Sequence, residues 1–389
     1  MDLDRLYLDY NATSPLSQSV LDWLRSGEFL FANPASQHSA GKFSRKLINE
    51  SRSQIYKSFG RNEKETHLFF HSGATEGVMS FAYSFSEWAR LTGRELLICY
   101  SKIDHPAVTM LRERFLGAHV KFLELQMTQH LEYDHSENLK IIQDKKDNRP
   151  DLLILYHHLW VHNETGIVSP LGELTKFKAI SDLYIHVDAV QAPGKMTNWK
   201  NLEVGDVFTF SAHKFGALKA IGFSFYTPEI SYSPLISGGA QQSGLRSGTE
   251  NPMGVRSIAL ALKDLELIKV DETSKKRAQL ESFLEEELQG IGGVISKLGA
   301  FRNSNTIYFY LNDLSSDIAL ALFDVNGLMI SAGSACSSGA AKSSVIMNHL
   351  GFKNESKNGL RISLSFNLSV NELEEIISRL KVIFKKLKS

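Results

Sequence analysis

Between residues 66 and 226 the chain alternates short β-rich apolar runs with longer amphipathic or polar segments, and this alternation restricts the possible folds more than any other feature. The pattern is typical of strands joined by helices, which form a mostly parallel sheet covered by helices. Ligands bind such sheets beyond the carboxyl ends of the strands. The runs that we expect to be strands cover residues 66–70, 95–100, 120–125, 152–156, 183–187, 207–210 and 221–226.

A chain of 389 residues exceeds the size at which single hydrophobic cores stop growing, so two domains are expected. We predict a large α/β domain over residues 16–256 and a smaller α+β domain formed by residues 1–15 and 257–389. The boundary falls in an expected helical stretch near residues 254–263. The elements expected in the smaller domain are a charged helix over 271–289, strands around 306–310 and 360–366, and a final helix from 370 to about 387.

Composition and charge exclude several classes of protein. Hydrophobic residues make up 43% of the chain and charged residues 22%, which are ordinary values for a globular protein. Lys plus Arg (43) balance Asp plus Glu (43), so neither nucleic acid nor a membrane surface is expected as the main partner. The chain has no apolar run long enough to span a membrane, and its acidic start is not typical of a secretory signal. Together with only two cysteines, these features predict a cytoplasmic protein in a reducing compartment.

A carboxylate and a lysine follow two consecutive expected strands. Asp188 lies in HVDAVQ at 186–191, and Lys214 ends SAHK at 211–214. A pyridoxal-phosphate enzyme needs both groups, because a buried carboxylate keeps the pyridine nitrogen of the cofactor protonated and a lysine binds its aldehyde covalently. We therefore assign these roles to Asp188 and Lys214 and expect pyridoxal 5'-phosphate as the cofactor.

The sequence SGATE at 72–76 follows an expected strand and opens an expected helix. Backbone N–H groups at the start of a helix, together with the hydroxyl of Thr75, can bind a phosphate. The alternative is an ordinary N-cap with a glycine turn, and this pentapeptide alone favours neither. We interpret residues 72–76 as a phosphate cup, because one cofactor then explains all three motifs.

Two further polar residues follow expected strands. His105 comes after the run 95–100, where an imidazole could stack on a cofactor ring, although a lone histidine at a strand end is more often structural. Asn163, in HNETG at 162–166, could donate a hydrogen bond to the phenolic oxygen of the cofactor or to a substrate carboxylate. By itself it would also fit an Asx turn.

These motifs and four further blocks resemble those of the cysteine desulfurases, in the class V aminotransferase group of fold-type I pyridoxal-phosphate enzymes. The resemblance spans nearly the whole chain and implies the fold of that group, with a large, mostly parallel sheet domain and a smaller α+β domain. The matching blocks are YLDYNAT at 7–13, NPAS at 33–36 with His38 and Gly41, SGATE at 72–76, HNETG at 162–166, HVDAVQ at 186–191, SAHK at 211–214, RSGT at 246–249 and GSAC at 333–336.

The resemblance implies a role for each matching residue. Arg361 would bind the substrate carboxylate, for which a guanidinium fork is the natural bidentate partner, although an arginine in a strand is more often an ordinary ion-pair partner. Asn163 and Asn11 would also contact the substrate. The implied cofactor ligands are Lys214 at the aldehyde, Asp188 at the pyridine nitrogen, Gln191 and Asn163 near the phenolic oxygen, His105 over the ring, Ala74, Thr75, Ser211 and His213 at the phosphate, and Thr249 at the phosphate of a second subunit.

The two cysteines differ in their surroundings. Cys99 lies within an expected strand, which is typical of a buried and inert cysteine. Cys336 lies in a stretch of Gly, Ser and Ala over 331–341 that we expect to be an exposed, mobile loop, where a thiolate can act as a nucleophile. The resemblance makes Cys336 the residue that takes sulfur from L-cysteine, leaving L-alanine and a persulfide, with Lys214 and His105 moving protons.

The resemblance also implies a homodimer with composite active sites and a sulfur-acceptor protein as a partner. Two other readings use the same cofactor residues: a selenocysteine lyase, and a different class V aminotransferase, which would need no loop cysteine. A third interpretation is a non-catalytic relative. The complete set of lysine, aspartate, histidine, cysteine and arginine residues that the reaction needs argues against it. Three places depart from the family pattern: Ser243 stands for a usual basic residue, Ala217 stands for a usual proline, and residues 77–79 lack a common polar residue.

Overall fold

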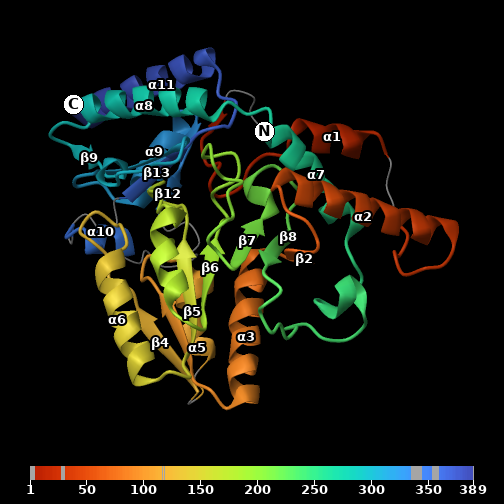
Figure 1. Ribbon diagram of the computed structural model, residues 1–389. Coiled ribbons are helices and arrows are strands. Elements are labelled where there is room, and N and C mark those ends of the chain that lie inside the picture. The colour runs from red at the N-terminus through yellow and green to blue at the C-terminus, as the bar shows by residue number, and fades with distance from the viewer. Residues whose placement is uncertain are drawn as a thin grey trace.

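A seven-stranded sheet forms the centre of the larger part of the computed structural model, which describes residues 5–27, 31–115, 117, 119–333, 344–352 and 359–388 (Figure 1). The strand order is β2-β8-β7-β6-β5-β3-β4. Neighbouring strands are parallel except β8, which is antiparallel to both β2 and β7. The strands are β2 (His67–His71), β3 (Leu96–Tyr100), β4 (Val120–Glu124), β5 (Leu153–Leu159), β6 (Leu183–Asp188), β7 (Val207–Ser211) and β8 (Gly222–Tyr226).

The predicted fold class is confirmed, and each of the predicted runs overlaps one strand of this sheet. The largest difference lies at the carboxyl end of β5, which continues to Leu159. His157 and His158 end the apolar run in the sequence, yet both side chains are buried in the sheet. His158 is accommodated because its Nε2 lies 3.1 Å from the carbonyl oxygen of Ser169, to which it donates a hydrogen bond.

Helices cover both faces of this sheet. Phe81 and Phe85 of α3 (Ala74–Thr92) pack on one face, and a second core containing Ile154 and Ile258 lies on the other. Coverage of both faces explains why the strands read as continuous apolar runs. Within the described ranges, no helix is both long and apolar enough to cross a bilayer. The elements of the second face are α1 (Gln18–Arg25), α2 (Ser39–Ser58), α6 (His135–Asn148), η1 (Leu171–Ala179) and α7 (Pro252–Leu265), while α4 (Pro106–Thr109) and α5 (Leu111–Arg114) follow β3.

A smaller antiparallel sheet, of order β12-β13-β10-β9, lies beside the first (Figure 1). Its core contains Phe309 of β10 together with Leu284 of α8 and Ile376 of α11, two helices that pack against each other. The predicted helices and strands of this region are confirmed within a few residues. The elements are α8 (Val270–Glu287), β9 (Gly292–Val294), β10 (Thr306–Leu311), α9 (Ser316–Val325), β12 (Ser331–Ala332), α10 (Val345–His349), β13 (Gly359–Ser363) and α11 (Val370–Lys388), with β1 (Leu6–Tyr7) paired to β11 (Leu328–Met329).

The hydrophobic cores group the chain around the two sheets. Leu8 packs in the core of the small sheet, whereas Ile258 and Leu262 of α7 pack in a core of the large sheet. The predicted division into 16–256 against 1–15 and 257–389 stays a prediction. Any domain boundary must take into account that α7 packs against the large sheet.

Candidate active site

The carboxyl ends of β6 and β7 bring Asp188 and Lys214 to the same edge of the large sheet. Asp188 ends β6, and Lys214 ends η2 (Ala212–Lys214), which directly follows β7. Val190 donates its backbone N–H to Oδ1 of Asp188 over 3.0 Å, and no residue of the described ranges donates to Oδ2. Burial raises the pKa of the Asp188 carboxyl above its ordinary value, and the charges of His105 and Lys214 oppose this shift. Both cationic groups therefore act on the same carboxyl at this edge of the sheet.

A segment near the N-terminus crosses the end of Lys214. The lysine Nζ donates hydrogen bonds to the carbonyl oxygens of Asn11 (3.0 Å) and Ala12 (2.8 Å). The carbonyl oxygen of Asn11 also accepts a hydrogen bond from Nε2 of Gln191 over 2.9 Å. Gln191 and Lys214 thus share one acceptor, which links the loop after β6 to the lysine after β7.

Asn11 is buried (1% exposed) and joins the two sheets. Its Nδ2 donates to the carbonyl oxygen of Asn163 (3.1 Å) and to Oγ1 of Thr306 (2.8 Å), and its Oδ1 accepts from Nδ2 of Asn305 (3.3 Å). Its backbone N–H donates to Oγ of Ser363 over 3.0 Å. Protein partners thus hold its whole side chain, and a contact of Asn11 with substrate stays a prediction.

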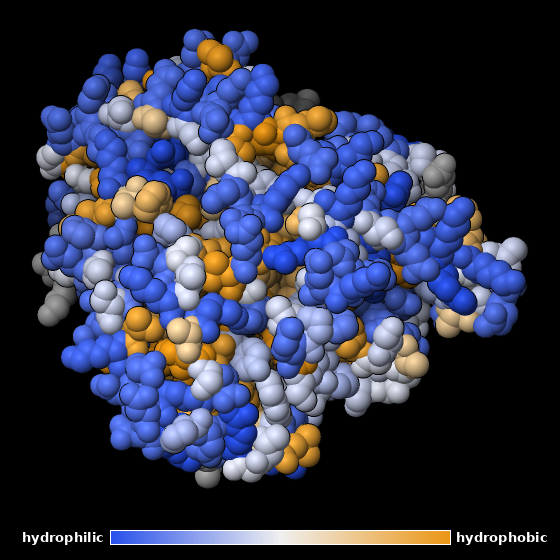
Figure 2. Space-filling view, in the orientation of Figure 1, coloured by the Kyte–Doolittle hydropathy of each residue, from blue (hydrophilic) through white to orange (hydrophobic). Residues whose placement is uncertain are grey.

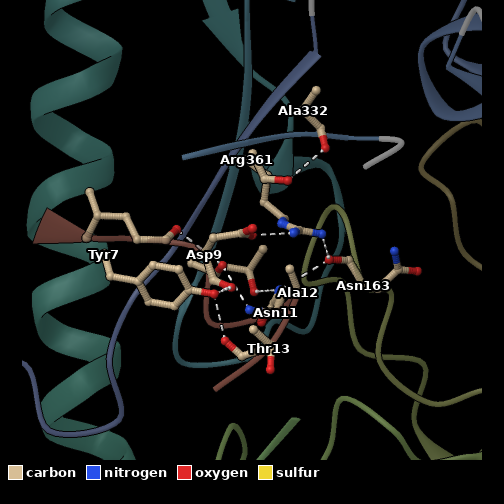
Figure 3. A network of polar contacts seen from close by, with 12 residues as sticks. Tyr7, Asp9, Asn11, Ala12, Thr13, Asn163, Ala332 and Arg361 are labelled. Atoms are coloured by element: carbon tan, nitrogen blue, oxygen red, sulfur yellow. Dashed lines mark hydrogen bonds and ion pairs between the residues drawn. The ribbon is translucent and has the colours of Figure 1, made fainter. Parts of the chain in front are cut away.

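Arg361 reaches the same segment from the small sheet and is 3% exposed (Figure 3). Its Nη2 donates to Oδ1 of Asp9 over 2.6 Å, and its Nη1 donates to the carbonyl oxygen of Asn163 over 3.1 Å. Its Nε is buried and has no partner among the described residues. The side chain of Asn163 points away from Arg361 in Figure 3, so the contact involves the backbone alone. Sequence patterns did not predict a role for Asp9, because its partner, Arg361, lies 352 residues away in the chain.

The predicted phosphate cup, residues 72–76, spans the start of α3. Its N-cap residue, Gly73, makes no side-chain cap hydrogen bond, and the backbone N–H groups of Ala74 and Thr75 have no acceptor in the described part of the chain. A Cβ placed on Gly73 would lie 4.0 Å from Oγ of Ser211, which puts this hydroxyl beside the cup. Unused donors at a positive helix end, with a neighbouring hydroxyl, are the groups that a phosphate needs.

Glu76 is held against the cup by an ion pair that the sequence did not indicate. Its Oε2 accepts the backbone N–H of Ser72 over 2.7 Å, and its Oε1 accepts Nε of Arg246 over 2.9 Å. Burial alone would raise the pKa of Glu76, but the hydrogen bonds from Arg246 and Ser72 bring it below its ordinary value. Arg246 therefore compensates a negative charge that would otherwise repel a phosphate.

His213 precedes Lys214 and contacts the N-terminal segment. Its Nδ1 lies 3.1 Å from Oγ1 of Thr13, within hydrogen-bond distance. Burial, together with the charge of Lys214, lowers the pKa of His213 to about 4. The ring is therefore neutral near neutral pH, where it can still donate a hydrogen bond. Its predicted role as a phosphate ligand stays a prediction.

His105 is the N-cap residue of α4. Its Nδ1 accepts the backbone N–H of Ala107 over 3.1 Å, so the proton of the neutral ring resides on Nε2. The preceding residue, Asp104, is 7% exposed and accepts a hydrogen bond from the hydroxyl of Tyr133 over 3.3 Å. Burial raises the pKa of Asp104 to about 7, and the charge of Asp188 adds to this shift. Nothing in the sequence distinguished Asp104 from an ordinary N-terminal turn residue.

The roles predicted for Thr249 and Cys336 stay predictions. Thr249 is exposed, and its contact with a second subunit stays a prediction. Cys336 lies outside the described residues, so its role as the sulfur nucleophile also stays a prediction. Cys99, by contrast, is buried in β3 as predicted for an inert cysteine, and burial raises the pKa of its thiol.

Two of the departures from the family pattern have a structural reason. The backbone N–H of Ala217 donates to the carbonyl oxygen of Ala212 over 3.2 Å, a bond that proline cannot make. Gly77 lets α3 approach the sheet, because a Cβ at this position would lie 2.7 Å from Nε2 of His71. Ser243 is exposed at a φ of 58°, and nothing in the structure explains why a basic residue is absent there.

The donor set at this edge of the sheet fits pyridoxal phosphate. Asp188 is a partly buried carboxylate with one oxygen unused within the described residues, and Lys214 follows the end of the next strand. The phosphate cup begins directly after β2, which is parallel to β6 and β7 in the same sheet. Carboxyl ends of parallel strands lie along one edge, so the three parts face one region.

Comparison with known proteins agrees with this geometry. The aminotransferase class-V family matches residues 6–376. A putative cysteine desulfurase IscS 1 from Bacillus subtilis (strain 168) is 30% identical over 384 residues, which cover 96% of each chain. Among solved structures, a NifS-like protein superposes with a TM-score of 0.84 at 25% identity, covering 99% of both chains. SspA in complex with cysteine superposes with a TM-score of 0.72 at 25% identity, covering 92% of this chain and 98% of that one. The chain therefore belongs to the class-V aminotransferase family and is similar to its cysteine desulfurases.

Proposed function

We propose that this protein is a pyridoxal-phosphate-dependent cysteine desulfurase, which converts L-cysteine to L-alanine and passes the sulfur to an acceptor through a persulfide on Cys336. The observation that carries the proposal is the placement of Asp188, Lys214 and the phosphate cup along one edge of the sheet, with Arg361 directed at the segment that covers Lys214. The cysteine desulfurase relative, and the cysteine bound to SspA, support L-cysteine as the substrate.

The residues of the large sheet would hold the cofactor. Lys214 would bind its aldehyde, the phosphate cup would bind its phosphate with help from Ser211 and His213, and Asp188 would hold a proton on its pyridine nitrogen. The protonated ring, when bound, withdraws electrons from the Cα of the substrate. A partly buried carboxylate suits this task, because a setting of lower dielectric than water strengthens its interaction with a positively charged ring nitrogen.

Substrate binding would fall to Arg361. Asp9 and the carbonyl oxygen of Asn163 fix the plane of its guanidinium group, so that the fork meets a carboxylate in one orientation. Lys214 would take the proton from the substrate Cα once its amine is free. The carbonyl oxygens that now accept from its Nζ would orient that amine for proton transfer.

Sulfur transfer would use Cys336 and His105. The thiolate of Cys336 forms an S–S bond with the substrate sulfur while the C–S bond breaks, and the electron pair of that bond stays on Cβ. Cβ then takes a proton and becomes the methyl group of alanine, so cysteine and one enzyme thiol give alanine and one persulfide. His105 would move the thiol protons through Nε2, because its Nδ1 is occupied by Ala107.

We further propose a homodimer in the cytoplasm that delivers sulfur to an acceptor protein, as in iron–sulfur cluster assembly or tRNA thiolation. The exposure of Thr249 supports the dimer, since its hydroxyl remains available to the phosphate of a second subunit. Sedimentation tests this point, and a fully active monomer at all concentrations would contradict it.

Cys336→Ala tests the reaction itself. The variant should keep the visible band of the bound cofactor and its change on adding L-cysteine, but lose alanine formation, sulfide release with a reductant, and the persulfide mass shift. Cys99→Ser is the matched control and should keep all of these, because Cys99 is a buried core residue. Lys214→Ala should lose both the band and turnover.

The outcomes separate the competing functions. If Cys336→Ala forms alanine at the wild-type rate, Cys336 is not the sulfur nucleophile and another class-V aminotransferase reaction fits better. If turnover requires Cys336 but strongly favours selenocysteine over cysteine, a selenocysteine lyase fits better. A wild-type protein that never develops the visible band with pyridoxal phosphate would overturn the cofactor assignment.

A further inference from the structure

Lys195 is a fully buried lysine (0% exposed), four residues after Gln191 in the loop that follows β6. Its Nζ donates a hydrogen bond to Oε1 of Gln191. Lysine side chains are almost never fully buried unless they are paired. The position of Lys195 therefore needs an explanation, and the proposed contacts to the cofactor and the substrate do not involve this residue.

The backbone of Lys195 is fixed on both sides. Its N–H donates to the carbonyl oxygen of Ala192 (3.1 Å), and its carbonyl oxygen accepts the N–H of Ser304 (2.7 Å) from the chain just before β10. The preceding Gly194 has a φ of 73°, and a Cβ there would lie 2.7 Å from Cδ2 of Leu265. The side chain of Lys195 thus reaches Gln191 from an anchor that packing and hydrogen bonds hold in place.

The surroundings of this amine are unfavourable for a charge. Burial lowers the pKa of Lys195 well below its ordinary value, the charges of Lys214 and Arg361 lower it further, and the charge of Asp9 opposes this. Within the described residues, the acceptor found for Nζ is Oε1 of Gln191. Burying such a group costs free energy, so general stabilisation is a poor reason for a lysine here.

The contact determines which way round the amide of Gln191 lies. A lysine Nζ keeps at least two N–H donors whether or not it is charged, and here it donates to the amide oxygen opposite it. The nitrogen Nε2 must then occupy the other side, where it donates to the carbonyl oxygen of Asn11 over 2.9 Å. Because Nε2 has two protons and Asn11 takes one, a second proton remains for the cofactor side of the loop.

We propose that Lys195 is a positioning residue that makes Gln191 present its amide N–H, and not its amide oxygen, to the phenolic oxygen of bound pyridoxal phosphate. This inference rests on the cofactor assignment in the proposed function. An acceptor facing the phenolic oxygen would repel it, whereas a donor stabilises its ionised form. In this role Lys195 would touch neither cofactor nor substrate and would act only through Gln191.

The test compares Lys195→Met with Lys146→Met in the full-length protein reconstituted with pyridoxal phosphate. Lys146 is the matched control, because it is also buried (5% exposed) and its Nζ donates to Asp182 and Leu152, away from the site. Lys195→Met should raise the pH midpoint of the visible band by about one unit and weaken cofactor binding about tenfold, because the ionised phenolic oxygen loses its donor. Lys146→Met should lower the urea midpoint of unfolding and leave the band unchanged.

A double-mutant comparison separates positioning from mere packing. Gln191→Leu should shift the band in the same direction, and adding Lys195→Met to it should give no further shift. If Lys195→Met does not fold, Lys195→Gln takes its place, since an amide can accept as well as donate and no longer imposes one orientation. It should cause a smaller shift in the same direction, absent when Gln191 is leucine.

Two negative results have different meanings. A wild-type protein without the band overturns the cofactor assignment itself. If the wild type has a normal band and the Lys195 variants have a band of the same wavelength and pH midpoint, the positioning role is wrong. The cofactor assignment is then unaffected.

Discussion

Gly77→Ala is expected to destabilise the protein and to weaken cofactor binding, because Gly77 allows α3 to lie close to the large sheet. A Cβ at this position would lie 2.7 Å from Nε2 of His71 on β2 and 2.7 Å from Cγ2 of Thr209 on β7. Both neighbours are buried, so neither can move away into solvent. The helix start must therefore shift away from the strands.

The size of the effect follows from two opposing terms. Overpacking a well-packed interior costs about 1–3 kcal/mol. Replacing glycine with alanine inside a helix gains about 1 kcal/mol, so the free energy of unfolding should fall by about 1 kcal/mol. Gly172→Ala is the matched control, since among the described residues no atom beyond its neighbours in the chain lies within 4 Å of a Cβ placed there. Its free energy of unfolding should be no lower than that of the wild-type protein.

The same shift should reach the phosphate cup, because Ala74 and Thr75 lie in the same turn as Gly77. Urea unfolding of the cofactor-free protein measures the first effect, and absorbance titration with pyridoxal phosphate measures the second, where we expect about tenfold weaker binding, or about 1.4 kcal/mol. If Gly77→Ala is as stable as Gly172→Ala and binds the cofactor with unchanged affinity, the close approach of α3 has no energetic consequence and this reasoning is wrong.

Three further predictions concern single groups. Burial raises the pKa of Asp104 to about 7, so the protonated carboxyl stabilises the folded protein at acidic pH and this stabilisation is lost as the pH rises through about 7. Urea titrations from pH 5 to 8 should show the loss in the wild type and not in Asp104→Asn. Arg246→Met removes the compensating charge from Glu76, so inorganic phosphate and the cofactor should bind about tenfold more weakly in equilibrium titrations, and unchanged binding would refute this role. Ala217→Pro removes the hydrogen bond to Ala212 and should lower the free energy of unfolding by about 1 kcal/mol. An unchanged free energy of unfolding would show that this hydrogen bond does not explain why alanine stands here.

Local sequence patterns were sufficient to predict the large sheet. Its strands are buried on both faces, so they appear as short apolar runs whose limits polar residues define. The same rule fails at the end of β5, where His157 and His158 continue the strand because both pack in the interior and His158 donates to a carbonyl oxygen. Most motifs of the candidate site could be recognised for a related reason, since they lie within a few residues of a strand end in the sequence.

The contacts that complete the site could not be predicted in this way, because they join segments far apart in the chain. Asp9 meets Arg361 across 352 residues. Gln242 uses its side-chain amide to bond both the N–H (2.6 Å) and the carbonyl oxygen (2.9 Å) of Phe70, on the edge strand β2, across 172 residues. No periodicity or short motif encodes such a pair, since it exists only after the sheets and loops have docked.

The segment at residues 9–13 shows what these distant contacts achieve together. Its carbonyl groups hold Nζ of Lys214 from the large sheet, while the side chain and N–H of Asn11 are held by Thr306 and Ser363 of the small sheet. Asp9, in the same segment, holds Arg361. The proposed cofactor lysine and the proposed substrate arginine are therefore positioned by one short stretch of chain, and any movement of the small sheet against the large one must change the surroundings of both groups at once.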